Sequence, residues 1–119
     1  MSTDPVEDLP AQLRAFARER DWEQFHTPKN LAMALAGEVG ELLEIFQWLT
    51  PEEAQAVMES ARADDVEDEL ADVIIYLVRL ADVLDIDLLD AARTKLGRNR
   101  DRFPPRDVKG RADIPPTPP

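Results

Sequence analysis

One segment, residues 31–49, restricts most strongly what this chain can fold into. All but four of its positions are apolar or glycine, and the exceptions are Glu38, Glu41, Glu44 and Gln47. Pro28 precedes the segment where a first-turn proline belongs, so we predict a long helix from Pro28 to Leu49. A helix that is apolar on almost every side has to be buried, either in a helical bundle or in an oligomer.

The remainder of the chain also predicts helices and no strands. Apolar residues at helical spacing indicate further helices over residues 6–20, 65–84 and 87–102. Between the long helices, Thr50-Pro51-Glu52-Glu53 combines an N-cap, a first-turn proline and a capping-box acid, which predicts a short helix ending near Ala63. We therefore predict an all-α fold, a bundle of four or five helices in one domain over residues 1–103. A Pro-rich flexible tail is predicted over residues 104–119.

Charge and composition limit the partners that such a bundle could have. The chain of 119 residues carries 25 acidic and 14 basic side chains, a net charge of −11, which would repel a nucleic-acid backbone. No apolar stretch is long enough to span a bilayer, and the acidic N-terminus lacks the basic start of a signal peptide. The absence of cysteine suits a reducing compartment. We predict a cytoplasmic protein with no nucleic-acid or membrane partner, which would need a metal ion to bind a phosphate compound.

Two pairs of acidic residues, each pair three positions apart, are candidate metal ligands. Glu38 and Glu41 share one face of the apolar helix, where bare carboxylates would each cost on the order of several kcal/mol unless paired or bound to a cation. Glu69 and Asp72 repeat the spacing on the next long helix, after 27 intervening residues. If the two helices face each other, four carboxylates meet, and their repulsion calls for a cation. The second pair has an alternative interpretation as part of a solvent-facing stripe with Asp65, Asp68, Tyr76 and Arg79.

The types of side chain available favour Mg²⁺ as that cation, with Mn²⁺ as a substitute. Di-iron bundles of this plan use Glu-x-x-His, whereas the one histidine here, His26, lies outside both acidic pairs and is expected to be a loop or cap residue. An oxygen-only site without thiol or imidazole suits Mg²⁺ or Mn²⁺ over zinc or copper. Because Mg²⁺ completes its shell with water and substrate phosphates, it would link this acidic protein to a phosphate compound.

Other side chains could bind the remainder of such a compound. Lys95 and Asn99 are one turn apart on the last predicted helix, and Trp22, Trp48 and Tyr76 offer aromatic faces on which a base could stack. Ordinary structural explanations also exist for two of them. Spacing alone places Trp48 in the core, and a solvated lysine such as Lys95 is favoured towards the C-terminus of a helix.

Three blocks of sequence resemble the MazG-like nucleotide pyrophosphohydrolases, and in particular their dCTP pyrophosphatase branch. These blocks are residues 20–31 with Arg-Asp-Trp-Glu-Gln-Phe-His, residues 37–48 with Gly-Glu-Val-Gly-Glu-Leu, and residues 69–77 with Glu-Leu-x-Asp-Val. The resemblance, which covers residues 13–103, implies an all-α homodimer or homotetramer. It implies that the metal ligands are Glu38, Glu41, Glu69 and Asp72. It also implies that Lys95 and Asn99 contact phosphates, and that the nucleoside pocket is lined by Trp22, Trp48 and Tyr76.

The resemblance implies Mg²⁺-dependent hydrolysis of a (deoxy)nucleoside triphosphate, dCTP or a 5-modified dCTP, to the monophosphate and pyrophosphate. Glu38 or Glu41 would orient or deprotonate the attacking water. The role implied by the family is the removal of unwanted nucleotides from the precursor pool. Leu13 stands where the dCTP branch often has a histidine near the base, which keeps open the same chemistry on dUTP or another non-standard nucleotide. An alternative of a different class is a non-catalytic helical module that binds a partner through its apolar faces.

Overall fold

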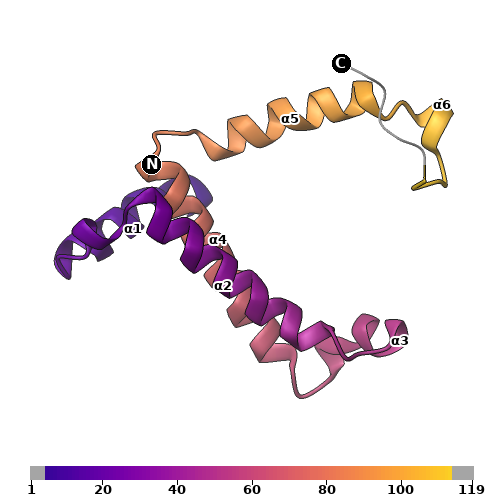
Figure 1. Cartoon of the computed structure of the whole chain (residues 1–119), viewed down its shortest axis with the longest axis horizontal. Coiled ribbons are helices and arrows are strands. Elements are labelled where there is room, and N and C mark those ends of the chain that lie inside the picture. The colour runs from indigo at the N-terminus through magenta and orange to yellow at the C-terminus, as the bar shows by residue number, and fades with distance from the viewer. Residues whose placement is uncertain (1–4, 114–119) are drawn as a thin grey trace. The chain divides into compact units, whose positions relative to one another are not determined.

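The computed structural model describes residues 5–113, with side chains from residue 8 onward. Every element of regular structure in this range is a helix, so the predicted all-α fold is confirmed (Figure 1). In chain order the elements are α1 (Pro5–Glu19), η1 (Glu23–Phe25), α2 (Pro28–Phe46), α3 (Pro51–Gln55), η2 (Val57–Glu59), α4 (Ala63–Val83), α5 (Leu88–Arg102) and α6 (Pro105–Val108).

A capping box at the start of α3 follows the end of α2. The Thr50 hydroxyl accepts a hydrogen bond from the Glu53 backbone N–H at 3.2 Å, and the Glu53 carboxylate accepts one from the Thr50 N–H at 2.9 Å. This arrangement needs extended backbone at Thr50, where φ is −70° and ψ is 162°. The helix ends at Phe46, three residues before the predicted Leu49, and the short helices α3 and η2 carry the chain into α4.

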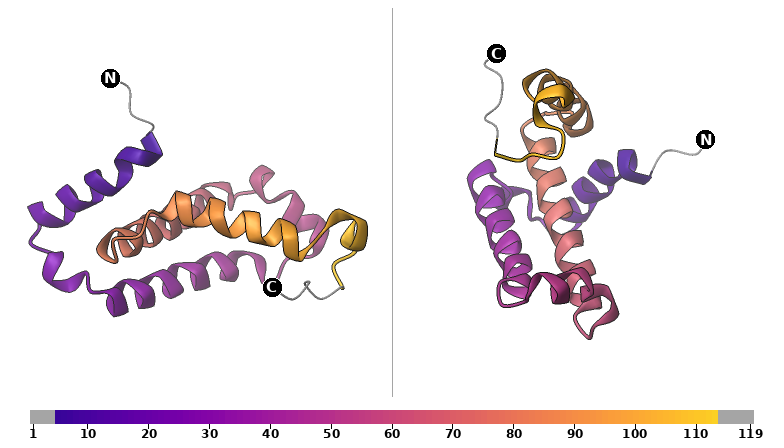
Figure 2. Two further views of the ribbon diagram at one scale, coloured as in Figure 1. Left: turned by 90° about the horizontal axis from the view of Figure 1, so that it is seen from above. Right: turned by 90° about the vertical axis from the view of Figure 1, so that its right-hand side faces the viewer.

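The residues up to Asp85 form one compact unit, which is built on α2 and α4. These two long helices pack side by side, and because α3 and η2 reverse the chain between them, they run antiparallel (Figures 1 and 2). At the turn between them a small core is buried, consisting of Ile45, Val57 and Val66, with Phe46 and Leu49 packed against it. At the other end α1 contacts α4, where Ala17, Val78 and Ala81 are buried.

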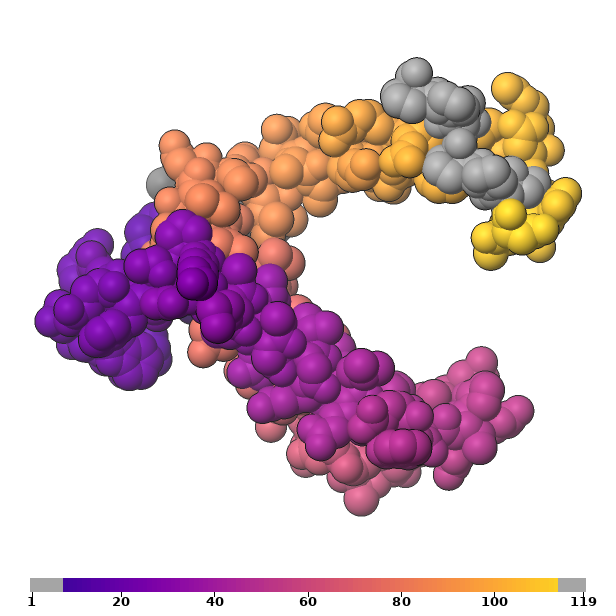
Figure 3. Space-filling view, viewed as in Figure 1, coloured from indigo at the N-terminus to yellow at the C-terminus, as the bar shows by residue number. Residues whose placement is uncertain are grey.

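Only one side of α2 is covered within this unit. Leu31 and Ile45 are its only buried residues, whereas Met33 and Leu43 are 63% and 60% exposed. Figure 3 shows side chains of α2 at the surface with no other element over them. This unit therefore does not provide the all-round burial of α2 that the sequence predicts. The placement of Trp48 in the core is wrong, since its side chain is 85% exposed.

A second compact unit begins at Ile86. Its main element, α5, begins after Asp87, whose side chain accepts a hydrogen bond from the backbone N–H of Asp90 at 3.0 Å. The short helix α6 lies in the stretch predicted as a Pro-rich tail, and residues 114–119 of that stretch fall outside the described range. Among the described helices, none is both long enough and apolar enough to cross a membrane.

Candidate metal centre and the adjoining pocket

Three of the four predicted carboxylates converge between α2 and α4. Glu38 and Glu41 extend from α2 and Glu69 from α4, and one carboxylate oxygen from each lies within 4.8 Å of the other two. The spacing of three places the first two on one face of α2, and the antiparallel packing brings α4 against that face. We call these three residues the carboxylate trio.

The trio is electrostatically unfavourable without a cation. Burial, together with the nearby carboxylates of Glu38 and Glu41, raises the pKa of Glu69 to about 7. Burial also raises the pKa of Glu38, and the negative charges of Glu41 and Asp72 act in the same direction. In addition, one oxygen each of Glu38 and Glu69, the Oε2 atoms, is buried without a hydrogen-bond partner. Buried polar atoms normally have partners, so these two oxygens are suited to bind a cation.

A divalent cation bound by oxygen ligands fits this arrangement. It would accept lone pairs from the two buried oxygens and would offset the repulsion that raises both pKa values. The donor set contains neither sulfur nor imidazole, which suits Mg²⁺ or Mn²⁺. The residues present therefore fit the ion that the sequence analysis predicts.

Asp72 lies one turn beyond Glu69 on α4 and is half-buried. It does not belong to the trio of mutually close oxygens, although its charge acts on Glu38. Asp72 instead contributes to the wall of a neighbouring pocket. The structure therefore places it between the trio and that pocket, and its predicted role as a direct metal ligand stays a prediction.

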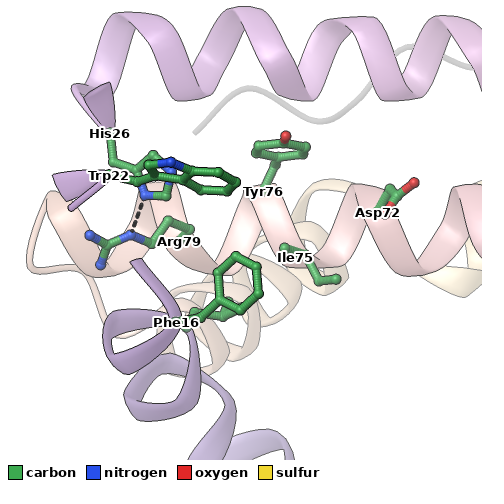
Figure 4. A pocket seen from close by; sticks show the side chains of 8 residues that line it. Phe16, Trp22, His26, Asp72, Ile75, Tyr76 and Arg79 are labelled. Carbon is green, nitrogen blue, oxygen red and sulfur yellow. Dashed lines mark hydrogen bonds between the residues drawn. The ribbon is translucent and has the colours of Figure 1, made fainter. Parts of the chain in front are cut away.

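The neighbouring pocket has a volume of about 260 Å³ and lies between α1, the η1 region and α4. Aromatic and aliphatic side chains form most of its wall (Figure 4). Its lining consists of Leu13, Phe16, Trp22, His26, Asp72, Ile75, Tyr76 and Arg79. Two of the three predicted nucleoside-binding aromatics, Trp22 and Tyr76, are therefore present in it. The edge of one ring faces the other in the pair formed by Phe16 and Trp22, with centroids 5.8 Å apart.

The polar end of the pocket was not anticipated from the sequence. Arg79, part of the stripe expected to face solvent, is buried, and its Nε–H donates a hydrogen bond to Nδ1 of His26 at 3.0 Å (Figure 4). Burial lowers the pKa of His26, and the positive charge of Arg79 lowers it further. His26 was expected to be a loop or cap residue. It does follow η1, but its side chain lines the pocket.

The other predicted substrate contacts lie elsewhere. Trp48 is almost fully exposed beyond the end of α2 and does not line the pocket of the described chain. Lys95 and Asn99 lie on α5 in the second compact unit. The roles predicted for these three residues stay predictions.

A helical hairpin that brings acidic side chains together next to an aromatic pocket is the arrangement to be compared with known proteins. The model of the MazG-like family matches residues 34–111. The chain belongs to the MazG-like family, which confirms the resemblance identified from the sequence.

Individual relatives point to one branch of that family. The chain is 47% identical over 114 residues to dCTP pyrophosphatase 1 from Bos taurus, a match covering 93% of this chain and 67% of that protein. It is 50% identical over 101 residues to dCTP pyrophosphatase 1 from Homo sapiens, a match covering 83% of this chain and 59% of that protein. Among solved structures, a pyrophosphatase from Archaeoglobus fulgidus superposes with a TM-score of 0.80 at 43% identity, covering 87% of this chain and 96% of the other. The chain therefore spans 59% to 67% of the length of these two curated relatives.

Proposed function

We propose that this chain hydrolyses a deoxynucleoside triphosphate, dCTP or a 5-modified dCTP, to the monophosphate and pyrophosphate in the presence of Mg²⁺. The observation that carries the proposal is the carboxylate trio, with its two unpartnered buried oxygens, beside a pocket that offers an aromatic face. The names of the curated relatives, dCTP pyrophosphatase 1, support the choice of substrate. The role that follows is the removal of unwanted nucleotides from the precursor pool, and its place would be the cytoplasm.

The carboxylates of the site would have two roles, which are to bind the ion and to activate the attacking water. A bound divalent ion would polarise the phosphate oxygens and would lower the pKa of a bound water molecule. Glu38 and Glu69 would hold that ion through their buried oxygens, and Asp72 would complete the set from the pocket side. Glu41, the exposed member of the trio, would orient the water and accept its proton as the water oxygen bonds to phosphorus and pyrophosphate leaves.

The remaining substrate contacts follow from the same arrangement. Trp22 offers the flat face on which a base would stack in the pocket. Lys95 and Asn99 would contact the phosphates, where the lysine would offset the charge of the departing pyrophosphate.

Uracil is a second candidate for the base that the pocket prefers. Leu13 and Ile75 make part of the pocket wall apolar, and neither offers a hydrogen bond by which cytosine could be told from uracil. Hydrolysis of dUTP or another non-standard nucleotide by the same residues is therefore the alternative to dCTP.

A product analysis tests the reaction. The purified chain, incubated with Mg²⁺ and a panel of deoxy- and ribonucleoside triphosphates that includes 5-modified dCTP and dUTP, is expected to release monophosphate and pyrophosphate in equal amounts. Addition of a chelator is expected to abolish the release, because the trio then lacks its ion. Release of inorganic phosphate and a diphosphate would contradict the proposed position of cleavage. Absence of turnover on every substrate would favour the non-catalytic interaction module instead.

We also propose that the chain forms a homodimer or homotetramer. Large apolar side chains are exposed along the two long helices, including Met33, Leu43, Leu70 and Ile74. Large apolar side chains left exposed in such numbers favour an association site. Light scattering coupled to size-exclusion chromatography is expected to give a mass of two or four chains of 13.4 kDa. A monomer at micromolar concentration would contradict this assembly.

A further inference from the structure

The helix α1 buries little of its own surface. Among its residues whose side chains the structure describes, only Ala17 is buried, and the large side chain of Phe16 is 45% exposed. The hydrophobic contribution to packing scales with the apolar area removed from water, so it is small for this helix. Polar contacts therefore have a large share in fixing the position of α1 against α4.

One carboxylate, that of Asp82, joins the two helices. Its Oδ1 atom accepts a hydrogen bond from Arg14 on α1, and its Oδ2 atom accepts one from Arg79 on α4 at 3.3 Å. The side chain of Asp82 is only 19% exposed and that of Arg79 is 9% exposed, so solvent screens this carboxylate less than one on an open surface. Asp82 thus holds one arginine from each helix, and its ion pair with Arg14 connects α1 to α4.

The position of α1 affects the pocket because α1 forms one of its walls. Leu13 and Phe16 line the pocket from this helix, and Phe16 contacts the edge of the Trp22 ring (Figure 4). Neither Arg14 nor Asp82 is part of the lining. If α1 moved away from α4, the pocket would lose this wall, whereas the carboxylate trio between α2 and α4 would keep its place.

We propose that Arg14 and Asp82 are positioning residues, which hold α1 where its wall completes the substrate pocket. Helix α1 then exchanges between a docked and an undocked position, and only the docked position offers the complete pocket to a nucleotide. The apparent dissociation constant of the nucleotide rises by the factor by which the docked fraction falls. This inference rests on the proposed function and deepens it, because it assigns control of substrate affinity to an ion pair outside both the pocket and the trio.

Two substitutions of Arg14 test the role of the ion pair. Arg14→Met removes the guanidinium but keeps a long side chain, whereas Arg14→Lys keeps the positive charge and a hydrogen-bond donor. We expect Arg14→Met to raise KM for dCTP, and the dissociation constant of dCMP measured by calorimetry, about fivefold. We expect kcat to stay near the wild-type value, because the trio is not moved. Arg14→Lys is expected to restore most of the affinity.

Arg18→Met is the matched control. Arg18 lies one turn further along α1 and forms an ion pair with Glu23 of η1, in which both side chains are exposed. The substitution is chemically the same as Arg14→Met but leaves the contact with α4, so KM and the affinity for dCMP are expected to keep their wild-type values. An equal rise of KM in both Met variants would overturn the inference, because loss of one positive charge from α1 would then explain the effect.

The fluorescence of Trp22 gives a readout that does not depend on turnover. The chain contains two tryptophans, so a Trp48→Phe background leaves Trp22 as the one emitter. In the nucleotide-free protein we expect Arg14→Met to shift the emission to longer wavelength, because Phe16 of the undocked helix no longer covers the indole. Arg18→Met in the same background is expected to leave the emission unchanged.

Asp82→Asn provides a second variant with a larger expected effect. It leaves the buried guanidinium of Arg79 without its carboxylate, so we expect a lower melting temperature and a greater rise of KM than in Arg14→Met. If Asp82→Asn does not fold, the comparison of the Arg14 variants with Arg18→Met decides alone.

The outcomes distinguish this inference from the proposed function. In Arg14→Met, an unchanged KM, an unchanged Trp22 emission, or a loss of kcat at constant KM would each overturn the inference. Hydrolysis of triphosphates together with any of these results would leave the proposed function intact. Conversely, a weaker affinity for dCMP and a shifted Trp22 emission in Arg14→Met, without turnover by any form of the protein, would support the inference while the hydrolytic function fails.

Discussion

Replacement of Glu69 by Gln is expected to lower kcat/KM for the preferred triphosphate by at least about a hundredfold. Changes in groups that merely support a metal ligand cost about 10- to 100-fold in metal affinity or activity, so loss of a ligand oxygen should cost no less. The same substitution should raise the melting temperature of the metal-free protein. It removes the carboxylate whose pKa burial and its neighbours raise to about 7, and so relieves the repulsion in the trio.

The opposite signs of these two effects make the prediction specific. A residue that matters only for folding would lose activity and stability together. Glu67→Gln is the matched control, because Glu67 is an exposed residue on α4 two positions earlier and lies outside the trio. We expect it to leave both quantities near their wild-type values. Retention of most activity by Glu69→Gln would show that the trio is not the metal site, as would a fall in the metal-free melting temperature.

The carboxylate trio could be predicted because local features determine it. A spacing of three fixes which residues of a helix share a face, and the Thr50–Glu53 capping box requires the chain to turn between the two long helices. Antiparallel packing then brings Glu69 against the face of Glu38 and Glu41. Sequence periodicity does not fix the register between the helices, so it could not tell that Glu69 rather than Asp72 would join the cluster of close oxygens.

The polar end of the pocket could not be predicted, because no local pattern encodes it. The bond between Arg79 and His26 depends on the path that the chain takes from η1 into α2 and on the packing of α4 beside that path. The one available signal was the position of Arg79 on the same line of α4 as Glu69, Asp72 and Tyr76. Trp48 shows the complementary limit, since periodicity assigns a residue to a helix face but does not reveal whether any other surface covers that face.

The stability of the metal-free protein is expected to fall as the pH rises from about 4.5 to about 7. The folded-state pKa of Glu69, about 7, lies above its ordinary value of 4.5, and that of Glu38 is also raised. In this window the folded chain therefore binds more protons than the unfolded chain, so the free energy of unfolding decreases with pH. The stabilising effect is fully present below pH 4.5 and is lost above pH 7. His26 acts in the opposite direction just below pH 6.5, because its folded-state pKa is lowered.

Mg²⁺ is expected to reverse this trend, because it binds the deprotonated carboxylates and displaces their protons. At a hundred times its dissociation constant and pH 7.5, it should raise the melting temperature by about 10 °C, and by much less at pH 5.5. Monovalent salt at the same ionic strength provides the control, because it screens the net charge of −11 without binding the trio. In Glu69→Gln the decline with pH should shrink, which leaves the opposing slope of His26 easier to detect. If Mg²⁺ stabilised that variant as much as the wild type at pH 7.5, the ion would have to bind elsewhere, and the link between the raised pKa values and the metal would be broken.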